Sequence, residues 1–308
     1  MTGKNISSKI TRRKFIKQSA AVTAGLGLSG NIRAGSKIQS FSVKQFEPFS
    51  FVQMADPQLF MCGYEVTGER LQTAVTQLNG LMPHFVVVCG DLVHTTDINS
   101  SSKQQEADYY FGEFAKMNPA ITLYNVSGNH DIGNTPTPES VQWYIPRFGP
   151  LWYSFVYRRN LFIVIESDLF KDPTYVRGLK TKQLNWLYDT LKSSMNKNFF
   201  HKFVFMHHPI YLSSPTEADE YSNLPLEIRS ELLSMLHDYN VEMVFNGHTH
   251  SLRYVNDDGL EMLTNSSSGC PFDDHAGYRI INVTENAVTH QYYDYDEMPI
   301  SLDYPLQA

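Results

Sequence analysis

The sequence predicts an α/β fold in which helices cover a sheet that is closed by antiparallel strands near the C-terminal end. From about residue 45, short apolar runs alternate with segments whose apolar residues recur at helical spacing, an alternation typical of α/β proteins. Residues 85–89 are apolar throughout and rich in valine, as expected of a strand buried on both faces. The 308 residues suffice for a large core and permit one large domain or two small ones.

Strands are expected where short apolar, β-branched or aromatic runs end in polar or turn residues. Such runs occupy residues 51–55, 85–89, 121–126, 202–206 and 241–245. Residues 153–157 and 161–165 predict a hairpin joined at Arg159 and Asn160. The chain after residue 245, to about Tyr295, predicts short strands joined by turns, for example at residues 256–259.

Helices are expected where apolar residues recur three or four positions apart. Leu71, Val75 and Leu78 follow this spacing within residues 69–81. The same pattern marks residues 104–117, 181–191 and 226–239. Because these segments alternate with the predicted strands, they are expected to connect neighbouring strands of the sheet.

The first forty residues indicate an export signal. Arg12-Arg13-Lys14-Phe15 lies in a basic run, and a short run of small apolar residues follows at 19–28. This arrangement is typical of a secretory leader rather than of a membrane span. The paired arginines resemble the bacterial twin-arginine signal. We therefore expect the twin-arginine export machinery as a partner, a periplasmic or other extracytoplasmic location, and no stable membrane span in the mature protein.

The charges are divided unevenly along the chain. The first forty residues carry eight of the 25 Lys and Arg residues and none of the 32 Asp and Glu residues, so the remainder has a formal net charge of −15. This balance argues against nucleic acid as a partner, since nucleic-acid binding needs a positive surface. The three cysteines, Cys62, Cys89 and Cys270, have no paired spacing. We expect all three to be small buried residues rather than disulfide partners or zinc ligands.

Five polar clusters each directly follow a predicted strand. They are Asp56-Pro57-Gln58, Gly90-Asp91, Gly128-Asn129-His130-Asp131, His207-His208-Pro209 and Gly247-His248-Thr249-His250. Because loops at the carboxyl ends of parallel strands meet in one crevice, a single shared site is expected. Oxygen and nitrogen donors without thiolate suit Mn, Fe, Zn or Mg.

The spacing within the clusters also carries predictions. Asp56 and Gln58 are two residues apart, as are His248 and His250, so both side chains of each pair are expected to leave an extended segment on the same side. Asp91 has two carboxylate oxygens and could bridge two cations. The glycines are expected to let the backbone turn tightly at the strand ends.

In this order the clusters resemble the calcineurin-like metallophosphoesterase superfamily, whose pattern is Asp-x-His, Gly-Asp, Gly-Asn-His-Asp/Glu, His-x-Pro and Gly-His-x-His. The resemblance covers roughly residues 48–298 and narrows to the subgroup of calcineurin-like phosphoesterase domain-containing protein 1, on cues that include residues 55–58, 148–155 and 221–225. It implies a four-layer αββα sandwich of two mixed sheets flanked by helices. The implied domains are a signal and linker at 1–40, a phosphoesterase domain at 45–298 and a tail at 299–308.

Matched motif by motif, the resemblance implies a binuclear metallophosphoesterase with two ions of Mn, Fe or Zn. One ion would be held by Asp56, Gln58, Asp91 and His250. The other would be held by Asp91, Asn129, His207 and His248. His130 would contact the substrate or protonate the leaving oxygen, and Asp131 would orient the ring of His130. A metal-activated hydroxide would hydrolyse phosphate monoesters in phosphoproteins or small phosphate esters.

Gln58 departs from the superfamily pattern, which usually has histidine there. An amide oxygen is a weaker ligand than imidazole, so the first site is expected to favour Mn or Fe over Zn. Two alternatives stay open. The same centre serves phosphodiesterases or pyrophosphatases acting on nucleotides or lipid headgroups, and the chain could be an exported non-catalytic binding protein with a degraded metal site.

Overall fold

The computed structural model describes residues 46–307, so the predicted export signal at 1–40 lies outside the described residues. The strands are β1 Phe49–Met54, β2 Phe85–Cys89, β3 Thr122–Val126, β4 Tyr153–Tyr157, β5 Asn160–Val164, β6 Lys202–Phe205, β7 Met243–Asn246, β8 Arg253–Asp257, β9 Leu260–Thr264, β10 Gly277–Val283 and β11 Val288–Asp294. The helices are α2 Tyr64–Leu81, α3 Ser101–Phe114, α4 Asn129–Ile132, α5 Pro138–Phe148, α6 Asp168–Lys171, α7 Arg177–Ser194 and α8 Leu226–Asp238.

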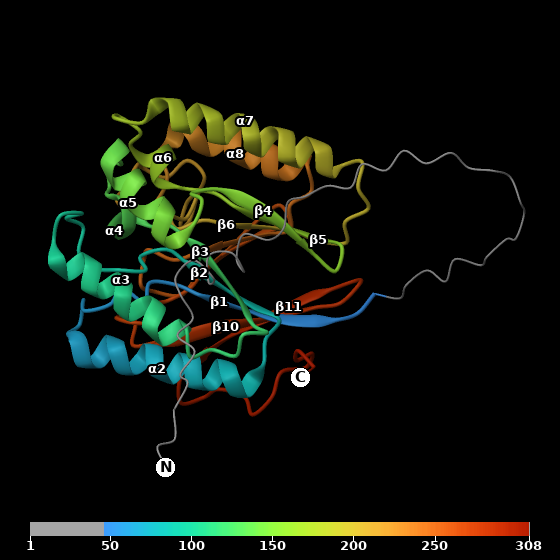
Figure 1. Ribbon diagram of the computed structural model, residues 1–308. Coiled ribbons are helices and arrows are strands. Elements are labelled where there is room, and N and C mark those ends of the chain that lie inside the picture. Colours follow the sequence, from blue (N-terminus) through green and yellow to red (C-terminus); the bar gives the residue numbers. More distant parts are fainter. Residues whose placement is uncertain (1–45, 308) are drawn as a thin grey trace, which may run out of the picture.

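Two mixed sheets lie between outer layers of helices (Figure 1). The first sheet has the strand order β11-β10-β1-β2-β3, and the second has the order β4-β5-β6-β7-β9-β8. Helices α2 and α3 cover the outer face of the first sheet, and α7 and α8 cover the second (Figure 1). The four-layer sandwich implied by the family resemblance is therefore confirmed.

Phenylalanine rings fill the space between the two sheets. Phe51 stacks on Phe85 at a centroid distance of 4.8 Å within the first sheet, and the ring of Phe162 from the second sheet meets Phe51 edge-on at 5.7 Å. Both arrangements are favourable for aromatic pairs. Because the layer is buried and close-packed, it fixes how the strand ends of one sheet lie opposite those of the other.

The strand prediction holds closely for the five strands that carry the polar clusters. The five predicted runs overlap the observed strands β1, β2, β3, β6 and β7. Strands β1, β2 and β3 pair in parallel in one sheet, and β6 and β7 pair in parallel in the other. The C-terminal strands, expected as one antiparallel tail, are divided: β8 and β9 extend the second sheet, whereas β10 pairs with β1.

Helix α5 was not predicted. Its sequence contains Pro138 and Pro146, and proline within a segment normally argues against a helix. Here Pro138 occupies the first turn, where its missing N–H costs nothing, and Thr137 caps the helix by accepting a hydrogen bond from the Ser140 N–H. None of the helices within residues 46–307 has the length and apolar character that crossing a bilayer requires.

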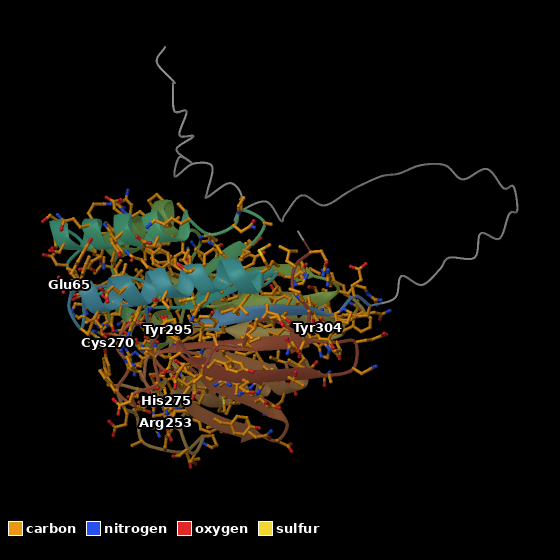
Figure 2. All side chains as sticks on the ribbon, turned by 90° about the horizontal axis from the view of Figure 1, so that it is seen from below. Glu65, Arg253, Cys270, His275, Tyr295 and Tyr304 are labelled. Atoms are coloured by element: carbon orange, nitrogen blue, oxygen red, sulfur yellow. A yellow bond between two sulfur atoms is a disulfide. The ribbon has the colours of Figure 1, made fainter. Side chains whose placement is uncertain are left out.

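The prediction of three unpaired buried cysteines is wrong for two of them. Cys62 is exposed and forms a disulfide with Cys270, with their Cα atoms 5.7 Å apart. Figure 2 places Cys270 close to Glu65 at the start of α2. The partners are 208 residues apart in the sequence, so their pairing depends on the fold and leaves no sign in the spacing. Cys89 is free and buried, as predicted.

The C-terminal segment, predicted as a tail, packs against the domain. The Ser50 N–H of β1 donates to the carbonyl of Tyr304, and Leu302 is buried. Tyr304 is labelled beside the first sheet in Figure 2.

Candidate metal centre

The predicted donors gather where the carboxyl ends of parallel strands from both sheets face each other. Asp56 and Gln58 follow β1, Asp91 follows β2, and Asn129 begins α4 directly after β3. The second sheet contributes His207 after β6 and His248 and His250 after β7. Three loops of one sheet and two of the other therefore supply one site.

A first group of donors comprises Asp56, Asp91 and His250, whose ligand atoms all lie within 4.8 Å of one another. Gln58 joins them, because its Nε2 donates to Asp91 Oδ2 at 3.4 Å. The Gln58 Oε1 is buried and has no hydrogen-bond partner within residues 46–307. A buried amide oxygen that accepts nothing is costly, and a cation held by this group would satisfy it.

A second group comprises Asp91, His207 and His248, again with ligand atoms within 4.8 Å of one another. Asn129 belongs with it, since its Oδ1 lies 3.0 Å from His207 Nε2. Asp91 is common to both groups. The structure therefore contains two candidate metal sites that share one carboxylate, and their donors are those expected from the sequence.

Backbone carbonyls fix the tautomer of each donor imidazole. His207 Nδ1 donates to the Cys89 carbonyl at 2.9 Å, and His250 Nδ1 donates to the Cys270 carbonyl at 2.5 Å. In His248 the roles of the two ring nitrogens are exchanged, because Nε2 donates to the Tyr221 carbonyl at 3.0 Å. A carbonyl only accepts, so one ring nitrogen of each histidine carries its proton and the other is left as a lone-pair donor, as metal ligation requires.

Five site residues adopt left-handed backbone conformations. The φ angles are 49° for Asp56, 33° for Gln58, 51° for Asp91, 72° for His248 and 51° for His250. The prediction of extended Asp-x-Gln and His-x-His segments is therefore wrong. The chain reverses direction at each strand end while it directs side chains inward, and Asp, Asn and His tolerate the left-handed region better than most residues.

Glycines in three clusters are required by close approach more than by turning. A Cβ at Gly90 would clash with the ring of His207, one at Gly128 would clash with Asp91, and one at Gly247 would clash with Asp56. Of these three, only Gly90 has a positive φ. The prediction that the glycines serve tight turns therefore holds for Gly90, and the other two leave room for donor side chains.

The electrostatics of the cluster call for positive charge. Burial raises the pKa of Asp56 to about 6. Burial alone would lower the pKa of His207, but the carboxylates of Asp91 and Asp56 outweigh it and raise that pKa to about 10. Burial and the charge of His207 lower the pKa of His248 to about 3. Cations bound here would replace the proton on His207, so the donor set fits a pair of metal ions.

His130 and Asp131 have different surroundings from those predicted. The His130 Nδ1 donates to the His94 carbonyl at 2.5 Å, and its Nε2 lies 4.0 Å from Asp91 Oδ2. The Asp131 carboxylate instead accepts the N–H groups of Gly128, Leu92 and Val93. The prediction that Asp131 orients the His130 ring is wrong. Asp131 ties the loops after β2 and β3 together, and the His94 carbonyl holds the ring.

Two residues around the centre escaped sequence reasoning. Tyr221 accepts a hydrogen bond from Asn129 Nδ2 at 2.8 Å on its hydroxyl, and its ring lies 4.7 Å from that of His248. Lys103 is fully buried and donates to the carbonyls of His130 and Thr95. In the sequence, residues 221–225 indicate only the subgroup, and nothing in the pattern around Lys103 marks that residue. The ring of His208 lies next to that of His248, with centroids 4.1 Å apart.

We expect Asp91→Asn to strip metal from the protein, because it removes the carboxylate shared by the two groups. The affinity should fall by more than the roughly 10- to 100-fold lost when a residue behind a metal ligand is removed. Elemental analysis after dialysis against a weak chelator measures this. Asp258→Asn is the matched control, because Asp258 also has a left-handed φ of 50° but lies in the β8–β9 turn. Equal metal content in both variants would contradict the shared role of Asp91.

We expect Gln58→His to shift metal preference toward Zn, because imidazole nitrogen suits Zn better than an amide oxygen does. Gln58 occupies the left-handed region that histidine also tolerates, so the backbone should accept the change. Competition of Zn against Mn, measured as the ratio of bound ions in wild type and variant, checks this. An unchanged ratio would show that Gln58 does not set the preference.

Comparison with known proteins identifies the family. A calcineurin-like phosphoesterase family model matches residues 49–252. The serine/threonine-protein phosphatase CPPED1 of Danio rerio is 35% identical over 267 residues, covering 82% of this chain and 86% of that protein. The human CPPED1 is 34% identical over 268 residues, with 82% and 85% covered.

Solved structures agree on the fold. A dimetal phosphatase from Danio rerio matches with a TM-score of 0.63 at 17% identity, over 81% of this chain and 97% of that one. The purple acid phosphatase PPD1 from yellow lupin matches with a TM-score of 0.61 at 14% identity, over 82% and 52%. The family resemblance expected from the sequence is confirmed. The chain belongs to the calcineurin-like phosphoesterase family and is a metal-dependent hydrolase of phosphate esters.

Proposed function

We propose that the protein is a phosphomonoesterase that acts on phosphorylated proteins or small phosphate esters. The observation that carries this proposal is the pair of candidate metal sites joined at Asp91, with the partly exposed imidazole of His130 beside them. The similarity to proteins named serine/threonine-protein phosphatases extends over most of the chain and favours the monoesterase over the diesterase alternative.

Two groups of residues would each hold one metal ion near the phosphoryl group of the substrate. When bound, a pair of cations supplies Lewis acidity, which offsets the charge of the phosphoryl oxygens and lowers the pKa of water. Asp56, Gln58, Asp91 and His250 would hold one ion, and Asp91, Asn129, His207 and His248 would hold the other. The Tyr221 hydroxyl accepts from the Asn129 Nδ2, which leaves Oδ1 directed toward His207 and available as a donor.

His130 is placed to handle the leaving group. Its Nδ1 is committed to the His94 carbonyl, so Nε2 is the nitrogen free to carry a proton to a substrate. That nitrogen faces Asp91 on a side chain that is about one-fifth exposed. As water attacks phosphorus and the ester bond breaks, the proton on Nε2 would pass to the departing alkoxide.

We expect the manganese-loaded wild type to hydrolyse phosphate monoesters faster than diesters. We expect His130→Ala to lower monoester turnover by about 100-fold or more, which is the usual scale for one general acid. Metal content should be retained, because His130 belongs to neither donor group. A panel of monoesters, diesters and pyrophosphates, assayed beside elemental analysis, measures both.

The matched control is His275→Ala, which removes an exposed histidine that pairs with Asp294 and belongs to neither donor group. It should leave turnover unchanged. Faster hydrolysis of diesters would overturn the monoesterase proposal. Full activity of His130→Ala would exclude this residue as the acid, and a metal-loaded protein inert on the whole panel would favour a binding protein.

We propose also that the protein is exported in folded form by the twin-arginine pathway, on the strength of Arg12-Arg13-Lys14-Phe15 and the apolar run that follows. Replacing both Arg12 and Arg13 with lysine should retain the protein in the cytoplasm of a bacterial host, since the signal depends on the arginines rather than on charge. Cell fractionation measures this, and Arg33→Lys is the control. Export of the double variant would exclude this pathway.

A further inference from the structure

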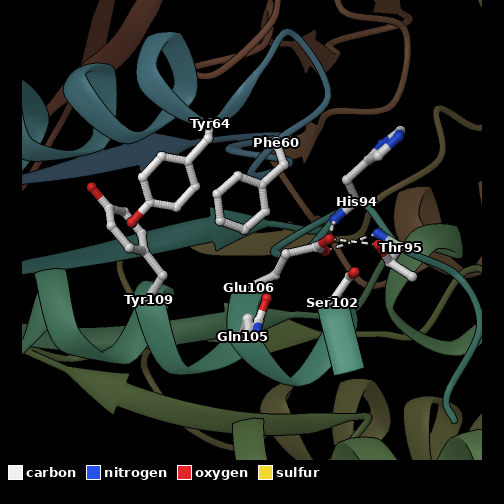
Figure 3. Close-up of a pocket in the computed structure, with 8 residues that line it drawn as sticks. All are labelled: Phe60, Tyr64, His94, Thr95, Ser102, Gln105, Glu106 and Tyr109. Atoms are coloured by element: carbon white, nitrogen blue, oxygen red, sulfur yellow. Dashed lines mark hydrogen bonds between the residues drawn. The ribbon is translucent and has the colours of Figure 1, made fainter. Parts of the chain in front are cut away.

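A cavity of about 500 Å³ lies beside His130, between the start of α2, the loop after β2, and α3. Figure 3 shows Phe60, Tyr64 and Tyr109 grouped at one end of it, with His94, Thr95 and Glu106 toward the other. We call it the aromatic cavity. None of the described contacts of the candidate metal centre uses its three aromatic rings.

The rings form a preassembled stacking surface. Phe60 and Tyr64 are nearly parallel, with centroids 4.6 Å apart and an interplanar angle of 9°. Tyr109 meets Tyr64 edge-on at 5.4 Å. Tyr64 nevertheless remains 57% exposed, so part of its ring is open to an added group. An added aromatic ring would find faces and edges already oriented for it.

At the polar end of the aromatic cavity, Glu106 and Thr95 bond each other, whereas the buried Nδ1 of His94 has no hydrogen-bond partner within residues 46–307. The Glu106 carboxylate accepts the N–H groups of His94 and Thr95, each at 2.8 Å, and the Thr95 hydroxyl at 2.5 Å. The described lining of the aromatic cavity includes no lysine or arginine. A phosphate or carboxylate would therefore meet the Glu106 carboxylate, with no lysine or arginine in the lining to bind it, because nearby Lys103 is buried and committed to the Thr95 and His130 carbonyls. The cavity favours an uncharged group.

The aromatic cavity adjoins the proposed leaving-group side of the centre through His94, which lines the cavity. The His94 ring stacks on that of His130 at 5.1 Å, with an interplanar angle of 20°, and the His94 carbonyl holds His130 Nδ1. Phe60 follows Gln58 by two residues, and Leu59 forms a β-bridge with Val93. A substrate whose leaving oxygen faces His130 would therefore extend its alcohol portion past His94 into the cavity.

We propose that the aromatic cavity binds an uncharged aromatic side chain adjoining the phosphorylated serine or threonine of a peptide substrate. The inference rests on the proposed function, because it takes His130 to face the leaving oxygen. A phenyl ring needs no hydrogen bonds. The several polar groups on the edge of a nucleobase would meet Glu106 and Thr95 groups that already bond each other, and His94 Nδ1 is the one buried polar side-chain atom of the described lining that lacks a partner, so most of those groups would be buried unpaired at a cost. This favours a peptide over a nucleotide.

The test uses binding, so that it does not depend on turnover. Two peptides are made with a methylene in place of the bridging oxygen of phosphoserine, which prevents hydrolysis. They differ only in the neighbouring residue, phenylalanine or alanine. Calorimetric titration of the full-length, manganese-loaded protein should show about 3- to 10-fold tighter binding of the phenylalanine peptide, the scale of one aromatic pair.

Tyr64→Ala should bring this ratio close to one. Its matched control is Tyr254→Ala, on β8, because Tyr254 is 58% exposed, against 57% for Tyr64, and the ratio should persist there. Gly68→Ala gives a second route, since a Cβ at Gly68 would lie 2.8 Å from the Tyr109 hydroxyl and displace that ring. It should also reduce the ratio.

Equal affinity of the two peptides for wild type, or a ratio that survives Tyr64→Ala, would overturn the inference. A nucleoside phosphonate that binds more tightly than the phenylalanine peptide, and loses affinity in Tyr64→Ala, would overturn the peptide assignment. The proposed function fails separately, if the same protein hydrolyses neither phosphoserine nor glycerol phosphate while its peptide-binding ratio stands.

Discussion

The buried carboxylate of Asp91 is the constraint on which the rest of the centre depends. Asp91 is 2% exposed. Its Oδ1 atom accepts a hydrogen bond from the His130 N–H at 2.9 Å and lies 3.3 Å from His207 Nε2. Asp56 is fully buried in the same cluster. Two carboxylates can remain ionised at such depth only beside positive charge. The glycine at 128 and the left-handed backbone at Asp91 both follow from placing that carboxylate there.

A site built from two sheets requires that the strand ends of one sheet stay aligned with those of the other. Buried hydrogen bonds between the sheets, in addition to the phenylalanine layer, hold this alignment. Gln53 of β1 donates to the Asn246 carbonyl of β7 at 2.9 Å, and Asn265 donates back to the Gln53 carbonyl at 2.8 Å. Both bonds are buried, so breaking either would leave unpaired polar groups. The apolar layer supplies stability, and these amides determine which residues of β1 lie opposite β7.

Sequence reasoning found the strands and the donors because each depends on local pattern. An apolar run that ends in Gly-Asp or Gly-Asn-His predicts both a strand and its functional end. The failures are long-range. The Cys62–Cys270 disulfide, the buried Lys103 and the hydroxyl of Tyr221 depend on which loops the fold brings together. The prediction for Asp131 was wrong because its place in the motif suggested His130 as its partner. Its carboxylate instead accepts hydrogen bonds from three backbone N–H groups.

The loop after β2 joins chemistry to substrate selection. Asp91 at its start belongs to both candidate metal sites, while His94 three residues later holds His130 and lines the aromatic cavity. Asp131 anchors the middle of the loop through Leu92 and Val93, and Glu106 anchors its end. Because both anchors are buried carboxylates, releasing the loop from either would leave a buried carboxylate without its hydrogen bonds. The rings of Tyr64 and Tyr109 lie on α2 and α3, outside this loop, so substitutions there can alter which substrates fit without moving a metal donor.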